Sequence, residues 1–226
     1  GDPDVLQVSE HPMPKIKSGW VLIKVMAFGL NRSELIVRAY EGDAPYINLP
    51  RVLGIECVGL VENSSNTRFT NGQKVVALMG GMGRSFDGSY AEYALVPEKY
   101  VFSVETDLSW EELAAIPETY FTAYGSLFEG LQLKPEEILL VRGGTSAAGL
   151  AAVQLAKSIG TTVLATTRSE KKSELLIKQG ADHVLIENGK VANSYNNYIQ
   201  MERIKSWNLL VRLHCPNHSV CSIVMV

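Results

Sequence analysis

The sequence predicts a fold of the β plus α/β class, with a β-rich domain first and an α/β domain with a parallel sheet after it. Strand-like apolar stretches separated by glycine turns fill residues 1–117. Strand-like and helix-like stretches alternate over residues 118–190, as expected for parallel strands joined by crossover helices. Residues 191–226 show neither pattern and are expected to form a divergent tail.

The β-rich segment contains several elements that can be placed individually. Its expected strands are 20–28, 53–62, 74–79 and 89–96. A short helix is expected over 32–39, after the break at Gly29-Leu30-Asn31. Ser109 and Glu112 have the spacing of a capping box and predict the start of a further helix. Pro117 is expected to interrupt that helix, and a longer helix follows it.

The α/β segment opens with a strand, a glycine turn and a helix. Residues 138–141 are an apolar run, typical of a strand that is buried on both faces. An alanine-rich helix is expected over 147–159, and a β-branched strand over 161–167. A tight turn at the first crossover of such a βαβ unit is where a dinucleotide pyrophosphate commonly meets a helix N-terminus.

The turn has the form Gly-x-Ser-x-x-Gly instead of the commoner Gly-x-Gly-x-x-Gly. Small residues here allow a phosphate to approach, and a serine hydroxyl can bind it. The expected cofactor-binding residues of the turn are Gly144, Thr145, Ser146, Ala147, Ala148 and Gly149. One alternative is an ordinary βαβ turn. Another is a hydrolase nucleophile elbow, which is disfavoured because position 148 is not glycine and no acid and histidine follow in a suitable order.

Composition excludes several other classes of protein. The chain has 226 residues, 46% hydrophobic and 20% charged, with a net charge of −3, which indicates neither a nucleic-acid nor a membrane partner. No apolar run approaches the ~18–20 residues that span a bilayer, and no signal peptide is recognisable. Three cysteines do not make a disulfide framework, so a cytoplasmic location is expected. The first residue is not methionine, so the natural start is expected to be missing.

Several motifs occur in the order that is typical of one superfamily. They are VLIKVMAFGLNRSEL at 21–35, LGIECVGLV at 53–61, the glycine-rich stretch at 71–97, the stretch at 118–169 that contains the turn, and GADHVLIENG at 180–189. Over residues 3–190 the chain resembles the medium-chain dehydrogenase/reductase superfamily and, within it, the zinc-free quinone oxidoreductase branch.

The resemblance implies a GroES-like substrate domain followed by a Rossmann domain, with the cofactor between them. It implies hydride transfer to a quinone or an α,β-unsaturated carbonyl compound. Asn31 matches the family's active-site asparagine, although a turn asparagine is the simpler alternative. Thr122 matches a threonine near the nicotinamide, and the alternative is a helix hydroxyl that bonds its own backbone. Ile36 stands where many relatives have a tyrosine, so no proton donor is assigned.

Zinc is not expected at the active site. Gly29-Leu30-Asn31 and Gly54-Ile55-Glu56 occupy the places where zinc-dependent relatives have a cysteine and a histidine. Glycine, leucine and isoleucine side chains cannot bind zinc, which needs about three protein ligands. In the loop at 80–88 we expect no structural zinc lobe either, and Arg84 and Phe86 there are weak candidates for facing the cleft.

The expected cofactor is NADP(H). An NAD site usually has an acid ~20 residues after the glycine motif, to bind the ribose 2′-hydroxyl. Here that place is Thr166-Thr167. The residues expected to bind the 2′-phosphate end are Thr167, Arg168, Ser169 and Lys172. Alternatively, Ser169 caps the next helix and the basic residues are only solvated.

Beyond residue 190 the resemblance ends. We expect no later Rossmann strands there, and hence a truncated or aberrantly spliced product. The alternative is that the tail folds as a helix over the open sheet edge. The tail contains four possible soft-metal ligands, His214, Cys215, His218 and Cys221. Their spacing is unsuited to binding one zinc ion. A homodimer is doubtful without those strands. The alternatives to a reductase are a non-catalytic nucleotide-binding or interaction fragment and, less favoured, a zinc alcohol dehydrogenase.

Overall fold

The computed structural model describes residues 1–187 and the strand segments 204–208 and 222–224. The chain divides into two compact units, Gly1–Glu118 and Thr119–Val226. No helix within the described residues is both long and apolar enough to cross a bilayer. The four possible metal ligands of the tail, and a helix over the sheet edge, lie outside the described residues.

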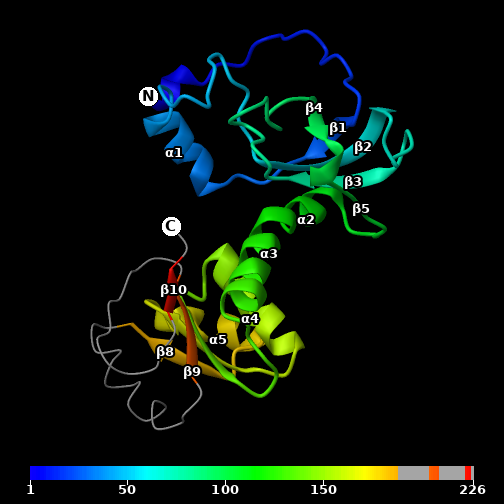
Figure 1. Ribbon diagram of the computed structural model, residues 1–226. Coiled ribbons are helices and arrows are strands. Elements are labelled where there is room, and N and C mark those ends of the chain that lie inside the picture. The colour runs from blue at the N-terminus through cyan, green and yellow to red at the C-terminus, as the bar shows by residue number, and fades with distance from the viewer. Residues whose placement is uncertain (188–203, 209–221, 225–226) are drawn as a thin grey trace. The chain divides into compact units, whose positions relative to one another are not determined.

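The first unit is built on an antiparallel sheet (Figure 1). Its strands are β1 (Trp20–Ala27), β2 (Glu56–Ser65), β3 (Lys74–Leu78), β4 (Tyr93–Pro97) and β5 (Val101–Ser103), in the order β4-β1-β2-β3-β5. Alternate side chains point into one core, as the two-residue period of a strand requires. The fully buried members of that core include Val21, Ile23, Val75, Val96 and Val101.

Two expected strands begin later than the sequence indicated, and one strand was not anticipated. β2 begins at Glu56 instead of residue 53, because Gly54 has φ +104° and turns the chain away from the extended conformation. β4 begins at Tyr93 instead of residue 89, because the chain before it forms a loop. β5 has only three residues, which is too short to show a periodic pattern.

The helices of the first part of the chain begin where the sequence predicts them. α1 spans Arg32–Tyr40 and α2 spans Trp110–Ala114. At the start of α2 the Ser109 hydroxyl accepts from the Glu112 amide at 3.3 Å, and the Glu112 carboxylate accepts from the Ser109 amide at 3.0 Å. The predicted capping box is therefore confirmed. α3 (Pro117–Tyr124) begins at the predicted proline and continues into a π-helical turn, Gly125–Gly130.

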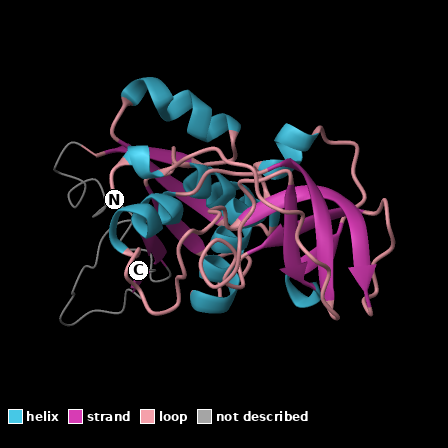
Figure 2. Cartoon of the chain, turned by 90° about the horizontal axis from the view of Figure 1, so that it is seen from above, coloured by secondary structure: helices cyan, strands magenta, loops and turns pink. Residues whose placement is uncertain are grey.

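The second unit is a parallel sheet with helices between its strands. The strands are β6 (Ile138–Arg142), β7 (Thr162–Thr167), β8 (His183–Ile186), β9 (Ile204–Asn208) and β10 (Ser222–Val224). Their order in the sheet is β10-β9-β6-β7-β8. If the five strands are numbered 1 to 5 in chain order and read from β8, the order is 3-2-1-4-5, as in a Rossmann sheet. Helix α4 (Ala147–Ser158) joins β6 to β7, and α5 (Ser173–Lys178) precedes β8. Figure 2 shows the helices in cyan and the strands in magenta.

The expectation that no strand follows residue 190 was wrong. β9 pairs in parallel with β6, from Ile138 opposite Ile204 to Arg142 opposite Asn208, and β10 pairs with β9. Because backbone groups make these pairings, short strands of mixed polarity can join the sheet without an apolar run. The edge of β6 that we expected to be open is therefore paired.

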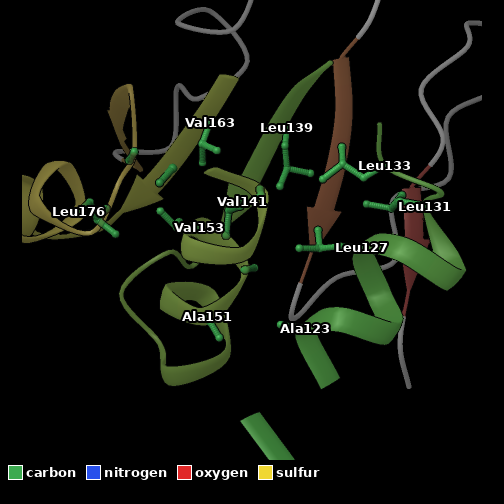
Figure 3. Close-up of a cluster of buried hydrophobic side chains, with 14 residues drawn as sticks. Ala123, Leu127, Leu131, Leu133, Leu139, Val141, Ala151, Val153, Val163 and Leu176 are labelled. Carbon is green, nitrogen blue, oxygen red and sulfur yellow. The ribbon is translucent and has the colours of Figure 1, made fainter. Parts of the chain in front are cut away.

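A single apolar cluster holds α4 and α5 against the sheet (Figure 3). β6 contributes Leu139 and Val141, and α4 contributes Val153, all fully buried. Leu127, beyond α3, and Leu176, on α5, complete it from two other segments. Close packing of this kind fixes the end of β6, and with it the turn that follows.

Candidate functional site

The glycine turn after β6 forms a closed set of hydrogen bonds at the start of α4. Ser146 is the N-cap residue of α4, and its hydroxyl accepts from the Gly149 amide at 3.1 Å. The same hydroxyl donates to the Gly143 carbonyl oxygen at 2.9 Å. The central serine therefore stabilises the turn, a role that glycine could not have. Its oxygen still lies at the positive end of the α4 dipole, where an anion binds favourably.

Gly149 has no room for a side chain, and Gly144 has little. A Cβ atom on Gly149 would lie 2.4 Å from the Gly143 carbonyl oxygen, which is backbone and cannot move aside. A Cβ on Gly144 would lie 3.0 Å from Ala165 Cβ and 3.1 Å from a Leu176 methyl group. The turn is thus pressed against β7 and α5. This is the close helix–strand approach expected of the last glycine in a dinucleotide motif.

The other predicted residues of the turn remain accessible to different degrees. Ala147 is exposed, while Thr145 and Ala148 are half-buried. Thr122 lies on α3, where its carbonyl oxygen accepts from the Ser126 hydroxyl at 2.7 Å. The structure therefore brings the six turn residues together, and it places Thr122 on a separate helix of the same unit.

A second hydrogen-bond network supports the turn from the end of β7. The Thr166 hydroxyl accepts from the Gly143 amide at 3.0 Å and donates to Glu187 Oε1 at 2.9 Å. Arg142 Nε donates to the same carboxylate oxygen at 3.0 Å. The sequence reasoning missed Arg142 and Glu187, because only the parallel pairing of β7 with β8 brings Glu187 to this place. Its charge is paired with that of Arg142.

The basic residues after β7 are exposed. Arg168 and Lys172 have no ion-pair partner among the described residues. Ser169 precedes a single 3₁₀ turn, Glu170–Lys172, without capping it through its side chain, and its amide donates to the Thr167 hydroxyl at 3.2 Å. Two unpaired cations and a polar backbone turn therefore follow directly on the strand that ends beside the glycine turn.

In the first unit, Asn31 lies at the start of α1 between two buried carboxylates. Its amide nitrogen Nδ2 donates to Glu56 Oε1 at 2.8 Å, and its backbone N–H donates to Glu34 Oε2 at 2.6 Å. Both carboxylates are only 3% exposed. Their burial was not predicted, because glutamate side chains are rarely buried unless paired.

Backbone and tyrosine donors satisfy these carboxylates. Glu34 accepts from the Ile55 amide at 3.0 Å and from the Tyr90 hydroxyl, while Glu56 accepts from the Glu118 amide at 2.8 Å. Burial raises the pKa of Glu56 above its usual value, although its hydrogen bonds from Asn31 and Glu118 oppose that shift. Burial also raises the pKa of Tyr90, and the hydrogen bond to Glu34 adds to the effect.

The two candidate residues of the loop at 80–88 have partners within the first unit. Phe86 makes an edge-to-face contact with Trp20, with ring centroids 5.3 Å apart, and packs against the core of the unit. Arg84 Nε lies 3.4 Å from Glu41 Oε2. The facing of Arg84 and Phe86 toward a cleft stays a prediction.

Comparison with known proteins identifies the family. Residues 17–106 match the family model described as the alcohol dehydrogenase GroES-like domain. Human quinone oxidoreductase is 33% identical to this chain over 187 residues, which make up 81% of this chain and 55% of the human protein. The chain belongs to the quinone oxidoreductase-like group of the medium-chain dehydrogenase/reductase superfamily. It spans about half the length of the curated relatives it matches.

Solved structures of this superfamily share the fold. A structure described as an NAD-dependent alcohol dehydrogenase superposes with a TM-score of 0.83 at 29% identity, covering 92% of this chain and 68% of the other. A mycobacterial protein complexed with NADPH gives 0.78 at 27% identity, covering 92% and 64%. Relatives of similar likeness thus differ in the nicotinamide cofactor that their descriptions name. The choice for this chain has to be argued from its own residues.

Zinc-dependent members of the superfamily need a set of ligands that is missing from the described part of this chain. No group of three or more histidine, cysteine, aspartate or glutamate side chains is positioned there to hold a metal ion. Cys57 is buried, and burial raises the pKa of its thiol to about 12, which disfavours the thiolate that zinc requires. A Cβ atom on Gly29 would lie 2.1 Å from Glu56 Oε1, so the carboxylate fills the space that a side chain at this position would need.

Proposed function

We propose that this chain is an NADPH-dependent oxidoreductase that transfers a hydride to a quinone or an α,β-unsaturated carbonyl compound without zinc. The observation that carries the proposal is the turn from Gly144 to Gly149, held at the N-terminus of α4 and followed, after β7, by basic residues that have no ion-pair partner in the described part of the chain. A dinucleotide phosphate requires this combination of a backbone seat, a helix dipole and positive charge.

The residues present fit such a cofactor. The α4 N-terminus and the small side chains of Ala147 and Ala148 would receive the pyrophosphate. Arg168 and Lys172 would bind the 2′-phosphate, and Ser169 would add a hydroxyl donor. Glu187 is the acid nearest the turn in the described hydrogen-bond network, and its pairing with Arg142 reduces its repulsion of a phosphate. When bound, NADPH supplies the hydride.

Asn31 would act on the substrate side of the reaction. Its side chain is held by Glu56, so its amide can orient a carbonyl or carboxamide group with little loss of side-chain entropy. Ile36, which stands where many relatives have a tyrosine, cannot donate a proton. The proton would then come from water or from a group that is not assigned.

Binding measurements test the cofactor assignment. Isothermal titration calorimetry should show tighter binding of NADPH than of NADH. Replacing both Arg168 and Lys172 with alanine should weaken NADPH binding by roughly 10–100-fold while leaving NADH binding nearly unchanged, because lost charge-assisted contacts cost ~1.5–3 kcal/mol. Lys171→Ala is the matched control, since this exposed lysine lies between the same residues. Equal weakening of both cofactors would contradict the 2′-phosphate role.

A second candidate function is favoured by the length of the chain. Because it spans 55% of the human relative, it is proposed alternatively as a fragment that binds the nucleotide without turnover. NADPH oxidation with a panel of quinones and enones separates the two: turnover supports the reductase, and binding without turnover supports the fragment. Absence of both would contradict both. A cytoplasmic location is part of the proposal, supported by the small number of cysteines.

A further inference from the structure

The side chain of Asn31 has a dedicated buried partner in Glu56. The distance from Asn31 Nδ2 to Glu56 Oε1 is 2.8 Å, and the two residues are 25 positions apart in the chain. Asn31 comes just before α1, whereas Glu56 is the first residue of β2. The contact therefore joins the start of α1 to the start of β2.

Glu56 has little freedom to move. It is 3% exposed, and its second oxygen accepts from the Glu118 amide at 2.8 Å. On the side of Oε1, the Gly29 backbone lies so close that a Cβ there would be 2.1 Å away. Both oxygens are thus fixed before Asn31 is considered, and the carboxylate is a rigid acceptor aimed at the amide.

This arrangement decides which end of the amide faces Glu56. An ionised carboxylate can only accept hydrogen bonds, so it selects the NH₂ group of Asn31 and turns the carbonyl oxygen elsewhere. We propose that Glu56 is a positioning residue which sets the orientation of the Asn31 amide in the proposed reductase. The inference rests on the proposed function, because it concerns how Asn31 meets its ligand.

The orientation should depend on the protonation of Glu56. A protonated carboxyl group becomes a donor and can bond the carbonyl oxygen of Asn31, which removes the preference for the NH₂ group. The ionisable groups around it are Glu34 on α1, Glu118 on α3, Cys57 on β2, and Tyr90, whose hydroxyl is bonded to Glu34. Burial and the charges of Glu34 and Glu118 favour the protonated form, whereas the donors from Asn31 and Glu118 oppose it.

The pH dependence of turnover tests the inference. With the full chain, NADPH and a quinone acceptor, kcat should fall by about tenfold per pH unit below the pKa of Glu56, as for one essential ionised group. In Glu56→Gln the side chain can still accept from Asn31 but cannot titrate, so this fall should be absent. Glu112→Gln is the matched control, because it neutralises an exposed glutamate of the same unit; it should keep the fall.

A second variant keeps the test informative if Glu56→Gln fails to fold. Such a failure is conceivable because the amide NH₂ of the new glutamine would face the Glu118 amide. Asn31→Ser keeps a residue that serves well as a helix N-cap but removes the amide group. It should lower kcat and should also lack the fall that Glu56 causes. In the unmodified chain, NMR should show the Asn31 side-chain NH₂ signals and the Glu56 carboxyl signal titrating with one midpoint.

The outcomes separate this inference from the proposed function. A fall in kcat that persists in Glu56→Gln, or Asn31 signals that do not respond when Glu56 titrates, would overturn the positioning role while leaving the reductase intact. An unmodified chain that neither binds nor oxidises NADPH would overturn the proposed function, and with it this role.

Discussion

At the scale of single residues, the Thr166 hydroxyl connects the glycine turn to the end of β8. It accepts from the Gly143 amide and donates to Glu187, which Arg142 also contacts. The side chain is fully buried, so water cannot replace either partner if the hydroxyl is removed. In the sequence, Thr166 was notable only because it stands where an NAD site usually has an acid. In the structure, Thr166 supports the glycine turn.

Thr166→Val should lower the free energy of unfolding by ~1–3 kcal/mol, because the Gly143 amide and the Glu187 carboxylate each lose a buried partner. Thr161→Val is the matched control. Thr161 is equally buried, but its hydroxyl has no hydrogen-bond partner in the described residues, so valine should be neutral or slightly stabilising. Urea denaturation of both variants measures the difference, and an equal loss in both would contradict the role of Thr166.

The buried carboxyl group of Glu56 predicts a pH dependence of stability. Its pKa is raised in the folded chain, so the folded state holds this proton more tightly than the unfolded state. Its stabilising contribution is complete below the unfolded pKa and is lost as the pH rises through the folded pKa.

Compared with Glu56→Gln, the unmodified chain should therefore lose stability as the pH rises above 4.5, the usual pKa of a glutamate carboxyl group. Urea denaturation at a series of pH values provides the measurement. A difference between the two proteins that stays constant with pH would show that the pKa of Glu56 is not raised.

At the scale of elements, α5 shows how a short helix can be held by one side chain. It spans only Ser173–Lys178, which is too short to be stable alone. Leu176 is fully buried, and one of its methyl groups lies beside the Gly144 backbone, whereas its neighbour Leu175 is 41% exposed. Tertiary packing therefore stabilises this helix, and the helix in turn supports the glycine turn.

Leu176→Ala should cost ~2–5 kcal/mol of unfolding free energy, the usual range for removing a buried leucine. It should also weaken NADPH binding, because the contact beside Gly144 is lost. Leu175→Ala, one position earlier on the same helix, should cost less than ~1 kcal/mol. Thermal unfolding followed by circular dichroism compares them, and similar losses would mean that α5 does not pack as described.

At the scale of the whole molecule, the cofactor links function to stability. A ligand that binds only the folded state at 100 times its Kd adds ~2.7 kcal/mol to the unfolding free energy. NADPH should therefore raise the Tm of the 226-residue chain, and NADH at the same concentration should raise it less. Differential scanning calorimetry measures both. A larger shift with NADH would reverse the cofactor assignment.

Local patterns in the sequence were sufficient for the elements that carry the glycine turn. The apolar run of β6, the alanine-rich α4 and the β-branched β7 each have the composition and period of their structure, so they were placed to within about two residues. The capping box at Ser109 and the helix start at Pro117 were equally local signals. β9 and β10 have no such pattern, since β9 is held by its pairing with β6 and β10 by its pairing with β9.

The sequence by itself determined the two kinds of domain, the glycine turn and the basic residues after β7, because these depend on neighbours along the chain. Only the tertiary structure decided that Glu34 and Glu56 are buried around Asn31 and that Glu187 reaches Thr166. It also decided that strands follow residue 190. These features depend on contacts between distant residues, and the free energy of such a contact is set by burial and partner geometry that no local pattern records.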